Sequence, residues 1–295
     1  MILVTGATGS IGTHLVRLLL DRDVPFRALV RDAAKGRALG CDYVVGDFAD
    51  PGSLASAMTG VDRLLLNSTG AEPVADGEQP MIRLQRAAID AARAAGVGRV
   101  VKVSVWHAHQ GGPLAEGAHW EIERYLKASG LGWTILQPSG FMQNFITGAG
   151  TFTAEGGIAG AYGDAGVSYV DCRDIAACAA ALLSGTAGLG ETYVLTGPQA
   201  LTHADVAREI STVLGRSVAH VELSPDEMAA SLRAQGLPAG FADDIAELCR
   251  EVAAGSLEAT TTAVRELTGR EPRTFARFLA DNADALRAGL LAATR

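Results

Sequence analysis

A glycine-rich segment near the start of the chain constrains the fold more than any other feature. Residues 4–12 read Val-Thr-Gly-Ala-Thr-Gly-Ser-Ile-Gly, between the apolar run Met1–Thr5 and an amphipathic stretch. Gly6 permits a tight turn, Gly9 lets the backbone approach a pyrophosphate, and Gly12 allows a helix to pack on the strand. The N-terminus of that helix offers free N–H groups and a positive dipole end to phosphate. The segment therefore predicts a dinucleotide-binding loop.

Short apolar runs alternate with amphipathic stretches over the first two-thirds of the chain. The runs are Met1–Thr5, Phe26–Val30, Tyr43–Gly46, Arg63–Asn67, Val100–Val105 and Trp133–Gln137. Helical patterns at Met81–Ala95 and His119–Ser129 each end before a glycine, the residue that commonly stops a helix. This alternation predicts parallel βαβ units, so the expected fold class is α/β, a doubly wound parallel Rossmann sheet.

The pattern changes after Pro138. A glycine-rich stretch with little periodicity is followed by two strand-like runs, Val167–Val170 and Glu191–Thr196, on either side of the alanine-rich helix Ile175–Leu183. Further helices are expected near 203–214, 225–234, 240–254 and 274–288. The first two follow N-terminal capping patterns, Thr202 with Asp205 and Ser224 with Glu227. We therefore expect a dinucleotide-binding core at 1–138, to which 167–197 return, and a smaller, mostly helical substrate lobe from 139–166 and 198–295.

Composition and charge exclude several classes of protein. The 295 residues include 25 Lys plus Arg against 33 Asp plus Glu, a formal charge of −8 that disfavours a basic nucleic-acid-binding face. No apolar run reaches the roughly 18 residues that span a bilayer. The four cysteines are scattered, so no metal site is expected, and no signal-peptide pattern precedes the first strand. We expect a cytoplasmic monomer or homodimer that binds a small-molecule substrate, with no nucleic-acid or membrane partner.

The end of the second strand predicts which dinucleotide binds. An acidic residue there accepts hydrogen bonds from the ribose 2′-hydroxyl, whereas an arginine accommodates a 2′-phosphate. Arg31 follows Phe26–Val30 directly, Lys35 comes soon after, and Asp32 stands one position beyond the arginine. The cationic cluster suits phosphate, with a solvated loop charge as the alternative interpretation. NADP(H) is favoured over NAD(H).

Several motifs in order along the chain resemble the atypical short-chain dehydrogenase/reductases of the NmrA-like group. They are Thr5–Gly12, Val30-Arg31, Gly46-Asp47-Phe48, Gly130-Leu131, Trp133–Pro138, Phe141-Met142-x-Asn144 and Val170–Ala176. The resemblance implies that Asp47 lies over the adenine, and Gln137 departs from the arginine usual in the family. The expected cofactor contacts are Gly6, Thr8, Gly9, Ser10, Ile11, Gly12, Arg31, Lys35, Asp47, Phe48, Asn67 and Ser68.

The proton donor usual in this group is missing. Short-chain reductases generally use the tyrosine of a Tyr-x-x-x-Lys motif with an assisting serine, but none of the five tyrosines here is followed by lysine at that spacing. By the resemblance, the lysine position matches His119, the tyrosine position Ala115 and the serine position Ser104. Ser104 and His119 are therefore the candidate catalytic residues. Alternative acids are His107, water or a hydroxyl of the substrate, and both candidates also fit purely structural roles.

Aromatic and sulfur side chains gather where the substrate is expected. The candidate substrate contacts are Trp106, His107, Phe141, Met142 and Phe145, although the same spacing fits ordinary core packing. We expect an NADPH-dependent ketoreductase that acts on a carbonyl of a hydrophobic, aromatic polyketide-like substrate, in a biosynthetic role such as antibiotic biosynthesis. The alternatives are an NAD(P)H quinone oxidoreductase and a non-catalytic NADP(H)-sensing regulator.

Overall fold

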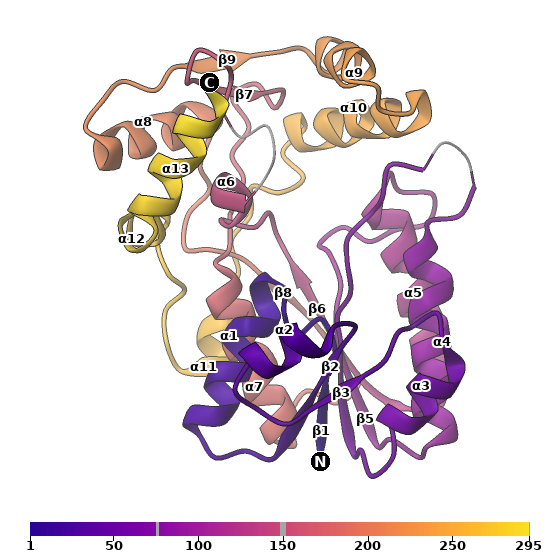
Figure 1. Ribbon diagram of the computed structural model, residues 1–295. Coiled ribbons are helices and arrows are strands. Elements are labelled where there is room, and N and C mark those ends of the chain that lie inside the picture. Colours follow the sequence, from indigo (N-terminus) through magenta and orange to yellow (C-terminus); the bar gives the residue numbers. More distant parts are fainter. Residues whose placement is uncertain (75–76, 148–151, 295) are drawn as a thin grey trace.

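A parallel seven-stranded sheet forms the centre of the computed structural model, which describes residues 1–74, 77–147 and 152–294 (Figure 1). Its strands are β1 (Ile2–Val4), β2 (Phe26–Val30), β3 (Tyr43–Val45), β4 (Arg63–Leu66), β5 (Arg99–Val103), β6 (Gly132–Pro138) and β8 (Glu191–Leu195). They are ordered β3-β2-β1-β4-β5-β6-β8, so the strand order reverses between β1 and β4. The predicted α/β doubly wound class is confirmed.

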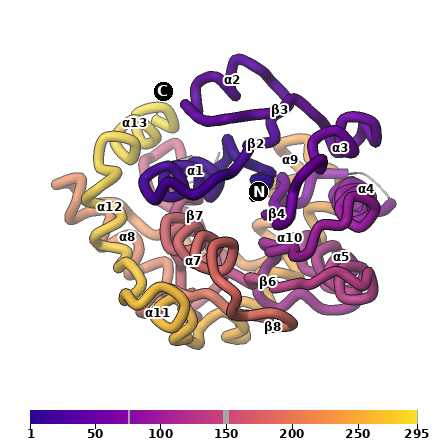
Figure 2. Tube along the Cα trace, turned by 90° about the horizontal axis from the view of Figure 1, so that it is seen from below, coloured from indigo at the N-terminus to yellow at the C-terminus, as the bar shows by residue number. Residues whose placement is uncertain are grey.

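Helices cover both faces of the sheet (Figure 2). The helices of this part are α1 (Ser10–Asp21), α2 (Ala33–Ala38), α3 (Pro51–Ala57), α4 (Pro80–Ala94), α5 (Ala115–Ala128), α7 (Cys172–Ser184) and α11 (Ala263–Thr268). One apolar core lies between the sheet and α1, α7 and α11, and a second lies under α3, α4 and α5. Because strands of a covered sheet are buried on both faces, they read as continuous apolar runs.

A mostly helical lobe lies beyond the carboxyl edge of the sheet (Figure 1). It consists of α6 (Asn144–Thr147), β7 (Ile158–Gly160), α8 (His203–Leu214), β9 (His220–Glu222), α9 (Pro225–Ala234), α10 (Ala239–Ala253), α12 (Phe275–Asp281) and α13 (Ala283–Ala293). The predicted N-terminal patterns form complete capping boxes, Thr202 with Asp205 and Ser224 with Glu227. A separate apolar core holds the lobe together. None of the helices in the described residues combines the length and apolar composition of a bilayer-spanning segment.

Several expected elements differ from the structure. Val167–Val170 forms only isolated bridges, from Val167 to Leu201 and from Val170 to Phe141. The single helix expected at 274–288 is two helices, α12 and α13, that break at Asn282. Within the glycine-rich stretch 139–166, residues 148–151 lie outside the described residues, and β7 pairs in parallel with β9. These differences arise because bridges and strand pairs depend on distant partners that local sequence patterns do not reveal.

Candidate functional site

The glycine-rich loop forms a cradle between β1 and α1. Gly6 has a φ of +63°, and a Cβ there would lie within 3.0 Å of Asn67 atoms, so only glycine suits the turn. Gly9 is the N-cap of α1, and no side chain caps that helix end. The uncapped N-terminus leaves backbone N–H groups and the positive dipole end directed at the cleft, which favours a bound phosphate.

The cradle opens into a cleft of about 380 Å³. Ten of the twelve predicted cofactor residues line it: Gly6, Thr8, Gly9, Ser10, Ile11, Arg31, Asp47, Phe48, Asn67 and Ser68. The same cleft is lined by Phe141 from the segment after β6. It lies at the point where the strand order reverses, which is where ligands bind in open α/β sheets.

Gly12 and Lys35 are the two predicted residues outside the cleft lining. A Cβ on Gly12 would lie 2.1 Å from the carbonyl oxygen of Gly6, so this glycine lets α1 approach the loop. Lys35 is exposed on α2. Gly12 therefore shapes the cradle without touching the space within it.

Two adjacent charged residues follow β2. Arg31 is exposed and lines the cleft, whereas the Asp32 carboxylate accepts a hydrogen bond from the Ala34 N–H at 2.6 Å and caps α2. The acid that would accept hydrogen bonds from a ribose 2′-hydroxyl is thus engaged in capping a helix. The arginine remains available for a 2′-phosphate.

The far wall of the cleft is formed after β3 and β4. The Asp47 carboxylate accepts a hydrogen bond from the Ala49 N–H at 2.8 Å, and the hydroxyl of Thr5 accepts one from the Asn67 N–H at 2.9 Å. These bonds hold both turns in place. The cleft thus offers the free N–H groups of α1, the guanidinium of Arg31 and the aromatic ring of Phe48. These groups fit a dinucleotide with a 2′-phosphate.

Ser104 lies just beyond β5 and is 2% exposed. Its hydroxyl donates to Oε1 of Glu123 on α5 at 2.5 Å, and the Gln137 amide donates to the same oxygen at 2.9 Å. Lys127 Nζ lies 3.5 Å from the other Glu123 oxygen. The buried carboxylate therefore has partners on both oxygens, and the Ser104 hydroxyl is directed at α5.

His119 lies one turn before Glu123 on the same helix and is 7% exposed. Lys102 Nζ, from β5, donates to its Nδ1 at 2.8 Å and to the Gln85 side-chain oxygen at 3.2 Å. Burial, and then the charge of Lys102, hold the pKa of His119 well below its ordinary value. His119 is therefore a neutral imidazole at neutral pH, a weaker acid than imidazolium.

Lys102 also belongs to this network, although no sequence motif singles it out. It is completely buried, and burial lowers the pKa of its ammonium to about 7 although the nearby Glu123 acts in the opposite direction. Gln85 links it to the cleft, because the Gln85 amide donates to the Ser68 hydroxyl at 2.8 Å. A lysine within the apolar run Val100–Val105 is the sequence feature that indicates a buried polar network, since buried lysines without partners are rare.

The predicted substrate residues do not form one surface. The rings of Trp106 and His107 stack with centroids 4.7 Å apart, and His107 Nε2 lies 2.5 Å from the Ser256 carbonyl oxygen of the lobe. Phe141 lines the cleft, but Met142 is buried in the lobe core. Phe145 packs edge-on against Tyr169 and Phe275 in the same core. The structure thus places Trp106, His107 and Phe141 nearer the junction of the two parts than Met142 and Phe145.

Comparison with known proteins adds three kinds of match. A model of the NmrA-like family matches residues 1–279. An NAD(P)H azoreductase from Xenophilus azovorans is 36% identical over 94% of this chain and 96% of its own length. A (4-alkanoyl-5-oxo-2,5-dihydrofuran-3-yl)methyl phosphate reductase from Streptomyces griseus is 34% identical over 97% of this chain and 99% of its own.

A solved structure shares the whole architecture. The NADPH-dependent quinone oxidoreductase of Escherichia coli, crystallised with NADPH, superposes with a TM-score of 0.81 at 32% identity. The match covers 95% of this chain and 99% of that one. The similarity therefore extends over both the sheet and the lobe.

Proposed function

The chain belongs to the NmrA-like family, and on that premise we propose that it is an NADPH-dependent oxidoreductase whose acceptors are planar, conjugated molecules of the quinone class. The proposal depends on the pairing of a complete dinucleotide cradle with a catalytic region that presents no acid to the cleft. When bound, NADPH supplies the hydride. The residues of the chain bind and orient the cofactor and set which acceptors can be reduced without an enzymic acid.

The cofactor half of the proposal uses the cleft described above. Gly6, Gly9 and the uncapped N-terminus of α1 provide space and N–H donors for a pyrophosphate. Arg31 suits the 2′-phosphate because Asp32 is engaged with the Ala34 N–H. The NADPH-bound neighbour and the NAD(P)H-dependent relative agree with this choice.

The choice of acceptor depends on one observation: both candidate catalytic side chains, Ser104 and His119, are already hydrogen-bonded to other residues of the protein. The Ser104 hydroxyl donates to Glu123, and His119 is a neutral, buried imidazole that accepts from Lys102. The cleft, as far as the described residues line it, contains no Tyr, Lys or His. An acceptor that needs no strong protein acid is therefore the best match.

Quinones satisfy that condition better than ketones. Hydride transfer to a quinone leaves a phenolate-like anion, whose conjugate acid has a pKa of about 10. This anion is stable enough to form before it takes a proton from the solvent. Reduction of a ketone leaves an alkoxide, a base about as strong as hydroxide, which forms readily only when an acid donates a proton during hydride transfer. The azo and quinone acceptors in the names of the relatives are likewise conjugated.

A ketoreductase remains the second candidate because the Streptomyces griseus relative is named as a reductase of an oxygen heterocycle that bears an alkanoyl group. In that case the acid would be a hydroxyl of the substrate, or Ser104 or His119 after a rearrangement of their present hydrogen bonds. The aromatic polyketide-like substrate expected from the sequence belongs to this second candidate.

A matched pair of acceptors tests the proposal. The purified protein is mixed with NADPH and either naphthoquinone or α-tetralone, and the loss of nicotinamide absorbance is followed after subtraction of the enzyme-free rate. We expect the quinone to be reduced at least about 100-fold faster, the contribution that a general acid makes to carbonyl chemistry. Comparable rates on the ketone would favour the ketoreductase, and tight NADPH binding without turnover of either acceptor would favour the sensing regulator.

A further inference from the structure

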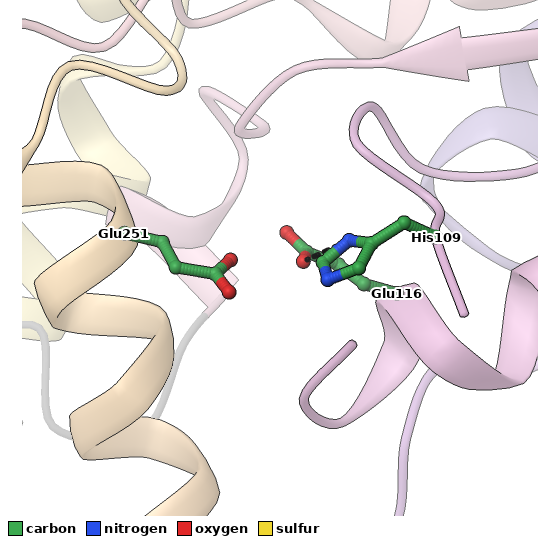
Figure 3. A group of neighbouring side chains, drawn as sticks. All are labelled: His109, Glu116 and Glu251. Atoms are coloured by element: carbon green, nitrogen blue, oxygen red, sulfur yellow. Dashed lines mark ion pairs between the residues drawn. The ribbon is translucent and has the colours of Figure 1, made fainter. Parts of the chain in front are cut away.

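Three side chains with metal-ligand chemistry meet where the lobe faces the sheet-bearing part. His109 lies in the segment after β5, Glu116 in the first turn of α5, and Glu251 on α10 of the lobe (Figure 3). One ring nitrogen of His109 and one carboxylate oxygen of each glutamate lie within 4.8 Å of one another. Figure 3 shows Glu251 pointing across the gap toward the other two side chains.

Glu116 is the buried member of the group, and one of its two carboxylate oxygens lacks a hydrogen-bond partner. The residue is 7% exposed, its side chain points toward Glu251, and its Oε2 is buried without a hydrogen-bond partner. His109 Nδ1 lies 3.6 Å from this oxygen, too far for a hydrogen bond, and the two residues form an ion pair only when the imidazole is protonated. Among the described residues, the ion-pair partner of Glu116 is His109, and no lysine or arginine pairs with Glu116 or Glu251. A buried carboxylate that faces a second carboxylate, with only a partly exposed histidine as an ion-pair partner, is costly unless a cation or proton lies between the two carboxyl groups.

His109 is oriented in the way that metal-binding histidines are. Its Nδ1–H donates to the carbonyl oxygen of His107 at 2.8 Å, which leaves the lone pair on Nε2. Histidine ligands commonly donate their other ring nitrogen to a carbonyl in this way, because the bond fixes the tautomer and the ring plane. Gly112 makes the approach possible, since a Cβ there would lie 2.9 Å from both the His109 ring and Glu116 Cβ.

We propose that His109, Glu116 and Glu251 bind one divalent transition-metal ion of the zinc class. An imidazole nitrogen with two carboxylates suits Zn²⁺, whereas Mg²⁺ and Ca²⁺ prefer all-oxygen sites. Three protein ligands leave a further position for water. Because zinc bonds to such ligands are about 2.0–2.2 Å long, the three atoms must move closer together, and the partly exposed His109 and Glu251 are free to do so.

The bound ion would act as a clasp between the two parts of the molecule. Glu116 belongs to a helix that packs on the sheet, while Glu251 belongs to a lobe helix, so coordination joins elements that are distant in the sequence. The His107 contact with the Ser256 carbonyl lies beside it. The spacing of Cys and His along the chain predicts no metal site, because the ligands of a site assembled across two lobes are not close in the sequence.

Calorimetric titration of the full-length protein with zinc chloride, after removal of metals with a chelator, tests the site. We expect one ion per chain. Zinc affinity should fall by more than about tenfold in Glu251→Gln and in His109→Ala, because loss of even a hydrogen-bond partner of a metal ligand commonly costs that much. Both changed residues are partly exposed, so these variants should fold. Glu247→Gln, an exposed change one turn earlier on α10, is the matched control and should bind zinc like the unmodified protein.

Two further readouts separate a built site from adventitious binding. Cobalt substitution should give visible absorption bands that change in His109→Ala, because histidine coordinates the ion. Zinc should slow amide hydrogen exchange in α10 of the unmodified protein and not of Glu251→Gln. Zinc affinity that is unchanged in both ligand variants, or no zinc binding at all, would overturn the proposal and leave a shared proton between the carboxyl groups. Zinc binding without protection of α10 would overturn the clasp.

Discussion

The two ends of the cleft are built in different ways. At the nucleotide end, backbone atoms form the site: Gly6 and Gly9 supply the space, and the uncapped α1 supplies the donors. Under the other end, buried side chains are joined in a network that includes the Lys102–His119 contact and the Ser104–Glu123 contact. The first end should bind a phosphate group wherever the backbone keeps its shape. The second end depends on each side chain keeping its partner.

This difference predicts where substitutions act. A change at the backbone end should alter cofactor affinity and leave the network intact, whereas a change in the network should alter stability and its pH dependence and leave cofactor affinity intact. A variant that affected both equally would show that the two ends are coupled.

Gly12→Ala should have the largest effect. The new Cβ would lie 2.1 Å from the Gly6 carbonyl oxygen and 2.6 Å from Ala7 Cα, so either α1 or the loop must shift. Overpacking of this kind costs about 1–3 kcal/mol of folding stability. The shifted loop should also lose its fit to the pyrophosphate, and a loss of about 3 kcal/mol of binding free energy would lower NADPH affinity by about 100-fold. Fluorescence titration of NADPH measures the loss.

Gly289→Ala is the matched control for Gly12→Ala, since both glycines lie within helices. A Cβ at Gly289 would meet only Phe152 Cε2, at 3.8 Å. Alanine should therefore leave NADPH binding unchanged and raise the unfolding free energy by up to about 1 kcal/mol. Unchanged NADPH affinity in Gly12→Ala would show that the cradle does not bind the pyrophosphate.

Arg31→Ala should change cofactor preference by about tenfold. The lost charge-assisted contact with the 2′-phosphate is worth about 1.5 kcal/mol, the lower end of the usual range because Arg31 is exposed. NADPH affinity should fall while NADH affinity stays constant, and both are measured by the same titration. Arg37→Ala, also exposed but outside the cleft lining, should leave the preference unaltered. An unchanged preference in Arg31→Ala would mean that another residue recognises the phosphate.

Lys102→Met should change how stability depends on pH. Burial lowers the Lys102 pKa from 10.5 to about 7, so between these values the unfolded chain binds a proton that the folded chain does not. The unfolding free energy should therefore rise with pH across that window, by at most about 1.4 kcal/mol per pH unit from this residue. Below about pH 7 the full cost of the buried ammonium is present, and above pH 10.5 it vanishes.

Urea unfolding at several pH values measures this slope. Lys102→Met should flatten it, while Lys127→Met, which changes a lysine side chain that is 40% exposed, should not. NADPH affinity should stay the same in both variants if the two ends of the cleft are independent. An equal slope in Lys102→Met and the unmodified protein would show that Lys102 titrates in the folded state as it does in water.

The parts predicted correctly from the sequence are those with local physical causes. The glycine spacing, the alternation of runs and the caps at Thr202 and Ser224 each depend on residues a few positions apart, and the structure contains all of them. The pairing of β7 with β9 and the bridge between Val167 and Leu201 connect distant residues, so local pattern gave no reason to expect them.

For the same reason, the sequence predicts only some members of the network under the cleft. Ser104 and His119 were found through a family resemblance, but their partners, Glu123 and Lys102, are set by how α5 packs on β5. Which hydroxyl or ring nitrogen is already engaged is a property of packing. The catalytic roles predicted for Ser104 and His119 therefore stay predictions that need a direct test.

Ser104→Ala supplies that test and should have the smallest effect on turnover. Glu123 would lose one hydrogen bond and keep the one from Gln137 and the ion pair with Lys127, so the unfolding free energy should fall by about 1–2 kcal/mol. Quinone reduction should fall by far less than the roughly 100-fold that loss of a general acid costs, because the hydroxyl is directed at α5 and not at the cleft. Ser56→Ala, an exposed helical change, is the stability control. A 100-fold loss of turnover with unchanged stability would reverse the comparison, because the network would then take part in the reaction and Ser104 would be the catalytic hydroxyl that the family resemblance predicts.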